Sequence, residues 1–314
     1  SSDVSSVTKI VKHAAPFFGF GMLCCILSSV SSASASLLVK MVKSIGPIEL
    51  LGLRCLMQFI ALLPYVTYNW RRHDVDFMGP RGKFKLLCFR GVIGPCSTFC
   101  YYMSIVRLPL GDAVTIKFSS IVFSQLLGFI VLHERPTLLD ILFSTIICTG
   151  VVLIAKPPFL FDPTATYDPE TLYGILFGLS AAFISGVSYV TVRKLGKQTH
   201  ATLNVFYYSF VGTFACLIFA ATVEKFKLPC YSELLFLFLT AVAGLTTQIF
   251  MTLGLQYERA GTYTMLKTFQ IILGFIFQII ILHNLPSTLS LVGACLIFSS
   301  IVGIAIRKFY KEYA

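Results

Sequence analysis

Four basic residues of this sequence stand within long apolar stretches, where ionised side chains are rare: Arg54, Arg90, Lys117 and Lys267. The acidic residues nearest to the stretches, such as Glu49, fall at or near the ends. A guanidinium or ammonium group in apolar surroundings needs a partner of opposite charge or several hydrogen-bond acceptors. The stretches contain too few carboxylates to supply that partner. The sequence therefore predicts a site in which an anionic ligand provides the missing charge.

Helical spacing places neutral polar residues on the same faces as these bases, because residues three, four or seven positions apart share one side of a helix. We expect the four bases and these neighbours to bind the substrate. The added candidates are Gln270 and Gln278 beside Lys267, Ser120 and Ser124 beside Lys117, and Ser97 and Tyr101 beside Arg90. Thr247 is added from another stretch, where it shares a face with Gly244. Lys267 is expected to be the principal anchor and Lys117 the weaker one, since glutamine amides reach further toward a carboxylate than serine hydroxyls do.

Each candidate also has a purely structural alternative. Serine-rich helix faces pack against other helices as readily as they line an aqueous path. Arg54 fits a structural hydrogen bond or a contact with a lipid headgroup, and Arg90 lies near the end of its stretch, where its side chain could reach the membrane surface. Lys267 could pair with backbone carbonyl groups or a helix end alone. These alternatives stay open at the level of sequence.

The apolar stretches themselves predict a membrane protein. Of the 314 residues, 56% are hydrophobic and only 12% are charged, too few to cover a compact water-soluble protein. A membrane-spanning helix needs roughly 20 largely apolar residues. Ten runs meet this requirement, at about 16–39, 47–68, 84–106, 111–132, 138–155, 172–192, 202–222, 232–256, 261–282 and 287–306. The expected fold class is an all-α membrane protein with ten transmembrane helices.

The basic residues predict which ends of these helices face the cytoplasm, because cytoplasmic loops carry an excess of Lys and Arg. Most of the 25 basic residues fall on one side, which includes both termini and residues 71–85, whereas residues 156–171 lie on the opposite side. Both termini are therefore expected in the cytoplasm. The net charge of +11 follows from this topology and from contact with anionic lipid, so no nucleic-acid partner is expected.

The sequence also repeats itself. A shift of 150 positions superposes Gly94 on Gly244 and Lys117 on Lys267, and earlier spans match at a shift of 154. Because each half holds five spans, the second half starts from the opposite side of the membrane, and the two five-helix repeats are inverted. Since the chain opens with Ser instead of Met, we expect an N-terminal segment to have been removed. The chain divides into an N-terminal tail (1–15), a first repeat (16–155), a connecting loop (156–171), a second repeat (172–306) and a C-terminal tail (307–314).

Short motifs in both halves carry a family resemblance. HERPT after the fourth span is echoed by HNLPS after the ninth, and each precedes an apolar span with small residues. These motifs resemble the EamA repeat of the drug/metabolite transporter superfamily. Within it, the chain resembles the G branch of the nucleotide-sugar-transporter-related solute carriers. The segments that carry this second resemblance are FRGVIG, GDAVTIKFSS, AKPPFLF, VRKLGK and GLQYERAG.

The resemblance implies a carrier with the drug/metabolite transporter fold. Its central cavity would be lined mainly by the first, third, fourth, sixth, eighth and ninth helices, with the fifth and tenth outside as scaffold or as the contact of a homodimer. Asn284 stands where the first repeat has Glu134, so a symmetric role for that glutamate is not implied. An integral multi-pass protein of the plasma membrane or of the endoplasmic reticulum and Golgi fits this family.

The sequence favours a secondary-active transporter of small organic anions that works by alternating access, and the resemblance makes a di- or tricarboxylate such as citrate the leading substrate. A nucleotide-sugar or neutral-metabolite exchanger is the alternative among carriers. A channel or a structural membrane protein is the alternative of another class. No enzyme activity, catalytic residue, metal or cofactor is expected, because the five histidines fall in tails or at span ends and no metal-like cluster emerges. The expected partners are a small anionic metabolite and the lipid bilayer.

Overall fold

The structure is a computed structural model that describes residues 19–42, 44–73, 79, 82–108, 110–134, 136–155, 169–223, 231–282 and 288–313. The regular elements of these residues are all helices. The first half contains α1 (Phe20–Met41), α2 (Pro47–His73), α3 (Phe84–Arg107), α4 (Leu110–Phe118), α5 (Ser120–Leu132) and α6 (Leu138–Ala155). The second half contains α8 (Pro169–Leu195), the short 3₁₀ helix η1 (Gly196–Gln198), α9 (Ala201–Val223), α10 (Tyr231–Tyr257), α11 (Ala260–Lys267), α12 (Phe269–Leu282) and α13 (Thr288–Tyr313).

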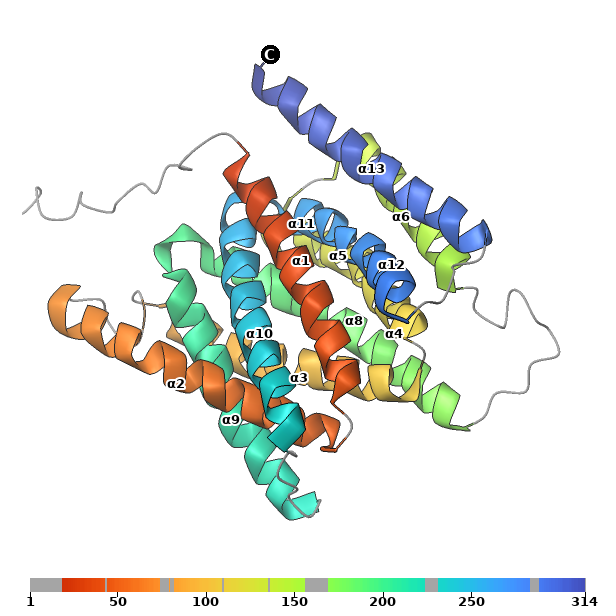
Figure 1. Cartoon of the computed structure of the whole chain (residues 1–314). Coiled ribbons are helices and arrows are strands. Elements are labelled where there is room, and N and C mark those ends of the chain that lie inside the picture. The colour runs from red at the N-terminus through yellow and green to blue at the C-terminus, as the bar shows by residue number, and fades with distance from the viewer. Residues whose placement is uncertain are drawn as a thin grey trace, which may run out of the picture.

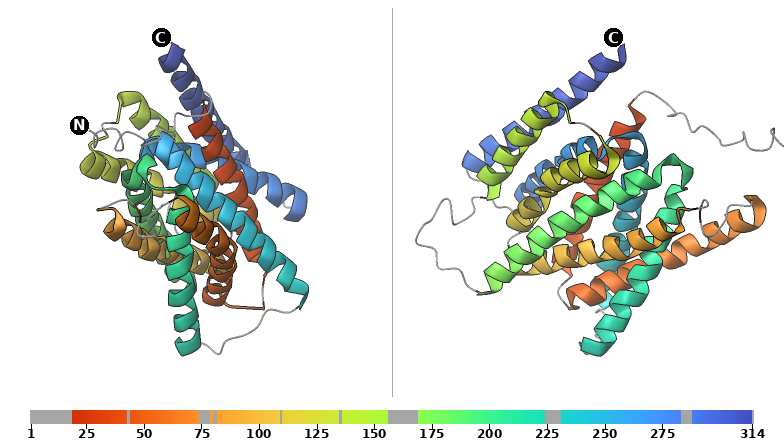
Figure 2. Two further views of the ribbon diagram at one scale, coloured as in Figure 1. Left: turned by 90° about the vertical axis from the view of Figure 1, so that its left-hand side faces the viewer. Right: turned by 180° about the vertical axis from the view of Figure 1, so that it is seen from behind.

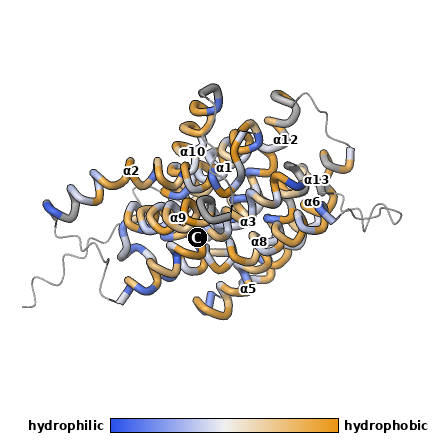
Figure 3. Tube along the Cα trace, turned by 90° about the horizontal axis from the view of Figure 1, so that it is seen from below, coloured by the Kyte–Doolittle hydropathy of each residue, from blue (hydrophilic) through white to orange (hydrophobic). Residues whose placement is uncertain are grey.

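These helices form the ten predicted membrane spans. Among the described residues, α1, α2, α8, α9 and α10 are long and apolar enough to cross a bilayer by length and composition alone. The other spans are α3, the α4–α5 pair, α6, the α11–α12 pair and α13. Large apolar side chains such as Ile60, Val92 and Leu235 are exposed on the outside, and Figure 3 shows hydrophobic residues along most of the helices. Such a surface fits lipid as its solvent.

The two halves pack in the arrangement expected for inverted repeats. The helix α1 runs along α10, and α3 runs along α8, so that exchanging the halves maps one pair onto the other. The helix α2 packs against its counterpart α9, and α6 packs against its counterpart α13. Figures 1 and 2 show the α6–α13 pair at the edge of the bundle, where the fifth and tenth spans were expected. The interior is thus enclosed by the first, third, fourth, sixth, eighth and ninth spans together with α2 and α9.

The fourth and ninth spans are each interrupted, which the sequence analysis did not predict. One residue separates α4 from α5, and one separates α11 from α12. At the first interruption the Ser119 backbone N–H and side-chain hydroxyl both donate to the Ile116 carbonyl, at 3.1 and 2.7 Å. At the second, the N–H and hydroxyl of Thr268 both donate to Met265. A hydroxyl that competes for a helix carbonyl tightens and bends the chain locally.

Several helices extend past their predicted ends. The helix α2 reaches His73, and α13 continues to Tyr313, through most of the predicted C-terminal tail of residues 307–314. The predicted N-terminal tail, most of the connecting loop and the HNLPS segment with Asn284 lie outside the described residues.

Labelling of the loops in sealed cells tests the membrane orientation. We expect a tag or an introduced cysteine in residues 71–85 to be labelled only after the cells are permeabilised, because the positive charges of this segment favour the cytoplasm. A tag in residues 156–171 is expected on the opposite face. Accessibility from the cytosol to both segments would reject the inverted topology. A tag at the C-terminus, which we also expect in the cytoplasm, should behave like one in residues 71–85.

Candidate substrate-binding site

A polar cavity lies between the two halves of the bundle, with about 620 Å³ of space not occupied by protein atoms, part of it open to the outside. Helices α1, α3, α4, α8, α10 and α11 line it, and these belong to the six spans that the family resemblance implied. The second span adds Arg54 from α2. The junction of two structural repeats is the usual place of the substrate site in carriers.

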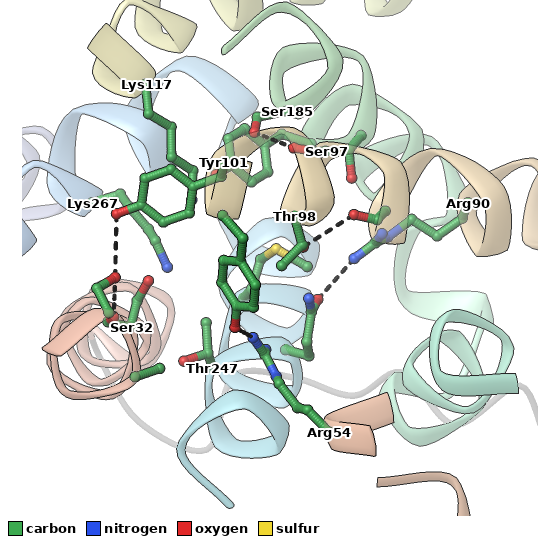
Figure 4. Close-up of a pocket in the computed structure, with 18 residues that line it drawn as sticks. Ser32, Arg54, Arg90, Ser97, Thr98, Tyr101, Lys117, Ser185, Thr247 and Lys267 are labelled. Atoms are coloured by element: carbon green, nitrogen blue, oxygen red, sulfur yellow. Dashed lines mark hydrogen bonds between the residues drawn. The ribbon is translucent and has the colours of Figure 1, made fainter. Parts of the chain in front are cut away.

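All four embedded bases line this cavity. Figure 4 shows Lys117 and Lys267 together at the left of the cavity, Arg90 at the right and Arg54 at the bottom. Arg90 is 1% exposed, and Arg54 and Lys267 are each 5% exposed. None of the lining residues that the structure describes is Asp or Glu. The sequence-based expectation of an embedded positive cluster without internal carboxylates therefore agrees with the geometry of these residues.

The two arginines each keep part of their hydrogen-bonding capacity unused among the described residues. Arg54 donates from Nη1 to the hydroxyl of Tyr102, and its Nε has no acceptor there. Arg90 donates from Nη2 to Oε1 of Gln248 at 2.8 Å, whereas its Nε and Nη1 have no acceptor. The Arg90 guanidinium also lies 5.1 Å from the ring centre of Tyr208. Each guanidinium therefore has buried N–H groups that the described protein groups do not satisfy.

The two lysines have different surroundings. Lys267 donates from Nζ to the hydroxyl of Ser28 at 2.9 Å and to its carbonyl at 3.3 Å. The Nζ of Lys117 lies 3.6 Å from the ring centre of Tyr101, a cation–π contact. Lys267 therefore combines a structural contact to α1 with a position in the cavity wall, and Lys117 is held by an aromatic face.

Three of the neutral candidates also line the cavity: Ser97, Tyr101 and Thr247. The Ser97 hydroxyl shares a 2.6 Å hydrogen bond with that of Ser185 on α8. The Tyr101 hydroxyl shares one of 3.2 Å with Ser36 on α1. The first bond joins the two halves, and the second joins two helices of the first half. Both hold cavity side chains in place, which makes the wall of the cavity rigid.

The remaining neutral candidates lie elsewhere. Gln270 is buried behind the wall and donates to the Ser36 hydroxyl at 3.4 Å. Ser120 and Ser124 are buried outside the cavity, and Ser124 shares a 2.8 Å hydrogen bond with Thr264 on α11. Helix packing, the structural alternative to substrate binding, thus describes the contacts of these serines. The interruption at Ser119 separates them from Lys117, so the polar helix face that begins at Lys117 ends there. Gln278 lies in α12, and its side chain is outside the described part of the chain.

Sequence reasoning missed Thr98 and Gln248 as cavity residues. The repeat contains a signal for both, since a shift of 150 positions superposes Thr98 on Gln248. Thr98 shares a 3.0 Å hydrogen bond with the Tyr208 hydroxyl, and Gln248 accepts the bond from Arg90. The two equivalent positions therefore bind two fully buried side chains, Tyr208 (0% exposed) and Arg90 (1% exposed).

An ionic cluster ties several helix ends together at the predicted cytoplasmic side. Glu134 pairs with Arg193 at 2.9 Å and accepts the backbone N–H of Ala260, at the start of α11, at 3.3 Å. Arg193 also donates to the carbonyls of Leu255 and Gln256 at 3.1 Å. The cluster joins the ends of α5, α8 and α10 to the start of α11. An arrangement of this kind can close one side of a cavity between halves.

Two inverted five-span halves, an apolar exterior and a polar cavity at their junction define a polytopic membrane transporter. The chain belongs to the EamA-like transporter family, whose sequence profile matches residues 19–156 and 172–306.

Individual relatives agree with this assignment. The chain is 35% identical over 306 residues to solute carrier family 35 member G1 of Homo sapiens, covering 96% of this chain and 83% of that protein. It is 25% identical over 230 residues to the pseudopaline exporter CntI of Pseudomonas aeruginosa, covering 71% and 75% of the two chains. One crystal structure superposes with a TM-score of 0.71 at 15% identity, over 91% of this chain and 96% of that one, which shows the shared fold.

Proposed function

We propose that this protein is a secondary-active carrier of small organic anions, with di- and tricarboxylates such as citrate as the favoured substrates. The observation that carries the proposal is the convergence of Arg54, Arg90, Lys117 and Lys267 on one cavity whose described lining contains no carboxylate. Each hydrogen bond to a charged group contributes about 1.5–3 kcal/mol. A compact ligand with several carboxylates can contact the lysine side and the arginine side together.

Alternating access is the mechanism that we propose for this site. The cavity lies where the two inverted repeats meet, and interrupted spans carry Lys117 and Lys267 next to their interruptions. Discontinuous helices at matching positions of two repeats commonly form the substrate site of such carriers. The Glu134–Arg193 cluster would then be closed in one state and separated in the other.

A nucleotide-sugar or neutral-metabolite exchanger is the second candidate. Tyr101, Tyr102 and Tyr189 give the cavity aromatic surface on which a base or a sugar could stack. The number of uncompensated bases favours a smaller, more densely charged anion, because a neutral ligand would leave them without a partner.

Uptake by purified protein in proteoliposomes tests the proposal. The panel consists of radiolabelled citrate, a dicarboxylate, a nucleotide sugar and a neutral sugar, with protein-free liposomes as control. We expect saturable uptake of the carboxylates and competition between them. Uptake confined to the nucleotide sugar or the neutral sugar would overturn the choice of substrate, and flux that never saturates would indicate a channel.

A further inference from the structure

We propose that Gly244 and Gly94 are positioning residues, each of which leaves bare backbone against which one cavity arginine lies. A Cβ atom at Gly244 would fall within 3.0 Å of Nε, Nη2 and Cζ of Arg54. One at Gly94 would fall within 3.0 Å of Nη1 and Cζ of Arg90, and of the ring of Tyr208. Real Cβ atoms essentially never come so close to other atoms. The present orientations of both guanidinium groups therefore require glycine at these positions. The inference deepens the proposed anion site and rests on it for its functional meaning.

The two glycines occupy equivalent places in the repeats, since a shift of 150 positions superposes one on the other. The side chains that lie against the two glycines differ. Arg54 crosses from α2 to lie on Gly244 of α10, whereas Arg90 lies along its own helix against Gly94, about one turn further on. Tyr208, which matches Arg54 at a shift of 154, touches the Gly94 position as well. Gly94 of the first half thus contacts Tyr208 of the seventh span, and Gly244 of the second half contacts Arg54 of the second span. Gly94 contacts Arg90 in addition.

The positions have a consequence for binding. An arginine that lies against a backbone surface has lost most of its rotamer freedom before the ligand arrives. Tyr102 and Gln248 hold one nitrogen each of Arg54 and Arg90, while other nitrogens keep no acceptor among the described residues. The two guanidinium charges are thus held in place at the cavity wall before a carboxylate arrives, which raises affinity by lowering the ordering cost.

Gly244→Ala is the informative variant, because the three atoms nearest to its new Cβ all belong to the flexible Arg54 side chain. The helix is expected to form, since alanine favours helices more than glycine does. Arg54 has to move, and the KM for citrate is expected to rise by about tenfold or more, as for loss of one charged hydrogen bond. Gly274→Ala in α12 is the matched control, because nothing lies within 4 Å of its Cβ position.

A double-mutant cycle with Arg54→Ala separates positioning from general damage. If Gly244 acts through Arg54, Gly244→Ala adds no further rise in KM when Arg54 is already alanine. Thermal unfolding of detergent-solubilised protein gives a readout that needs no substrate. We expect Gly244→Ala to lower the Tm when Arg54 is present. In the Arg54→Ala background, we expect Gly244→Ala to raise the Tm or leave it unchanged.

Additive changes in KM or equal Tm shifts in both backgrounds would overturn the positioning role, as would an unchanged KM in Gly244→Ala. A wild-type protein that transports no carboxylate would overturn the proposed function instead. The Tm cycle would still decide whether Gly244 positions Arg54 in that case.

Discussion

Lys267→Gln is expected to abolish carboxylate uptake in a protein that still folds. Lys267 is 5% exposed, lines the cavity and donates to Ser28 on α1. Glutamine keeps a donor for Ser28 but removes the positive charge, so the contact between α11 and α1 can persist while the ammonium–carboxylate bond is lost. Removal of one such bond lowers affinity by about tenfold to a hundredfold, and because Lys267 is the expected principal anchor, we expect a loss that a higher substrate concentration does not restore. Radiolabelled uptake in proteoliposomes measures the effect, with size-exclusion profile and Tm as measures of folding.

Lys117→Gln is the internal comparison for this prediction. Lys117 occupies the equivalent position of the first repeat but lies over the ring of Tyr101, and we expect uptake that is impaired yet measurable. Raising the citrate concentration should partly restore uptake in Lys117→Gln and not in Lys267→Gln. Normal citrate affinity in a well-folded Lys267→Gln protein would contradict its role as principal anchor. Loss of folding in that variant would mean that Lys267 has a structural role that glutamine cannot fill.

Arg90→Gln is expected to weaken citrate binding by about a hundredfold, the upper end of the range for a charged hydrogen bond. Arg90 is 1% exposed and has two nitrogens without an acceptor among the described residues, so the ligand is the partner that its charge can meet. Arg90→Lys keeps the charge but loses the planar fork, and we expect an intermediate affinity. Binding isotherms or the KM of uptake give the measurement.

Arg107→Gln is a suitable control for this series. Arg107 pairs with Glu170 at 3.1 Å, and the glutamate side chain is 67% exposed. Surface ion pairs contribute little, so KM and Tm are expected to stay close to those of the wild type. If Arg90→Gln and Arg107→Gln changed KM equally, the effect would come from the overall charge of the protein, and the role of Arg90 in the cavity would be rejected.

The sequence was sufficient to predict the ten spans and their arrangement in two inverted halves. Apolar length decides which segments cross a bilayer, and five spans per half decide the inversion. It did not predict the interruptions at Ser119 and Thr268, because neither glycine nor proline marks them and serine and threonine also occur in uninterrupted helices such as α9. The interruption depends on which carbonyl each hydroxyl reaches in the folded chain.

The bases of the site were predictable for a similar reason. A charged side chain inside an apolar stretch is costly unless it faces a cavity or a partner. Arg54, Arg90, Lys117 and Lys267 all line one cavity. Neutral residues lack this constraint. Helical spacing alone could not tell that Ser124 faces Thr264 while Ser97 faces Ser185 across the cavity wall. Whether any of these residues contacts a substrate stays a prediction.

The concentration of positive charge in the cavity has an electrical consequence. Arg54 and Arg90 are ionised at any physiological pH, so an empty cavity carries charge that a bound tricarboxylate would largely cancel. Carrying one elementary charge across a membrane potential of 100 mV changes the free energy by about 2.3 kcal/mol. If the cavity opens alternately to the two faces, the return of the empty protein is then the step most sensitive to voltage. Swapping one anion for another avoids that step, so exchange would run faster than one-way flux and would depend less on the potential.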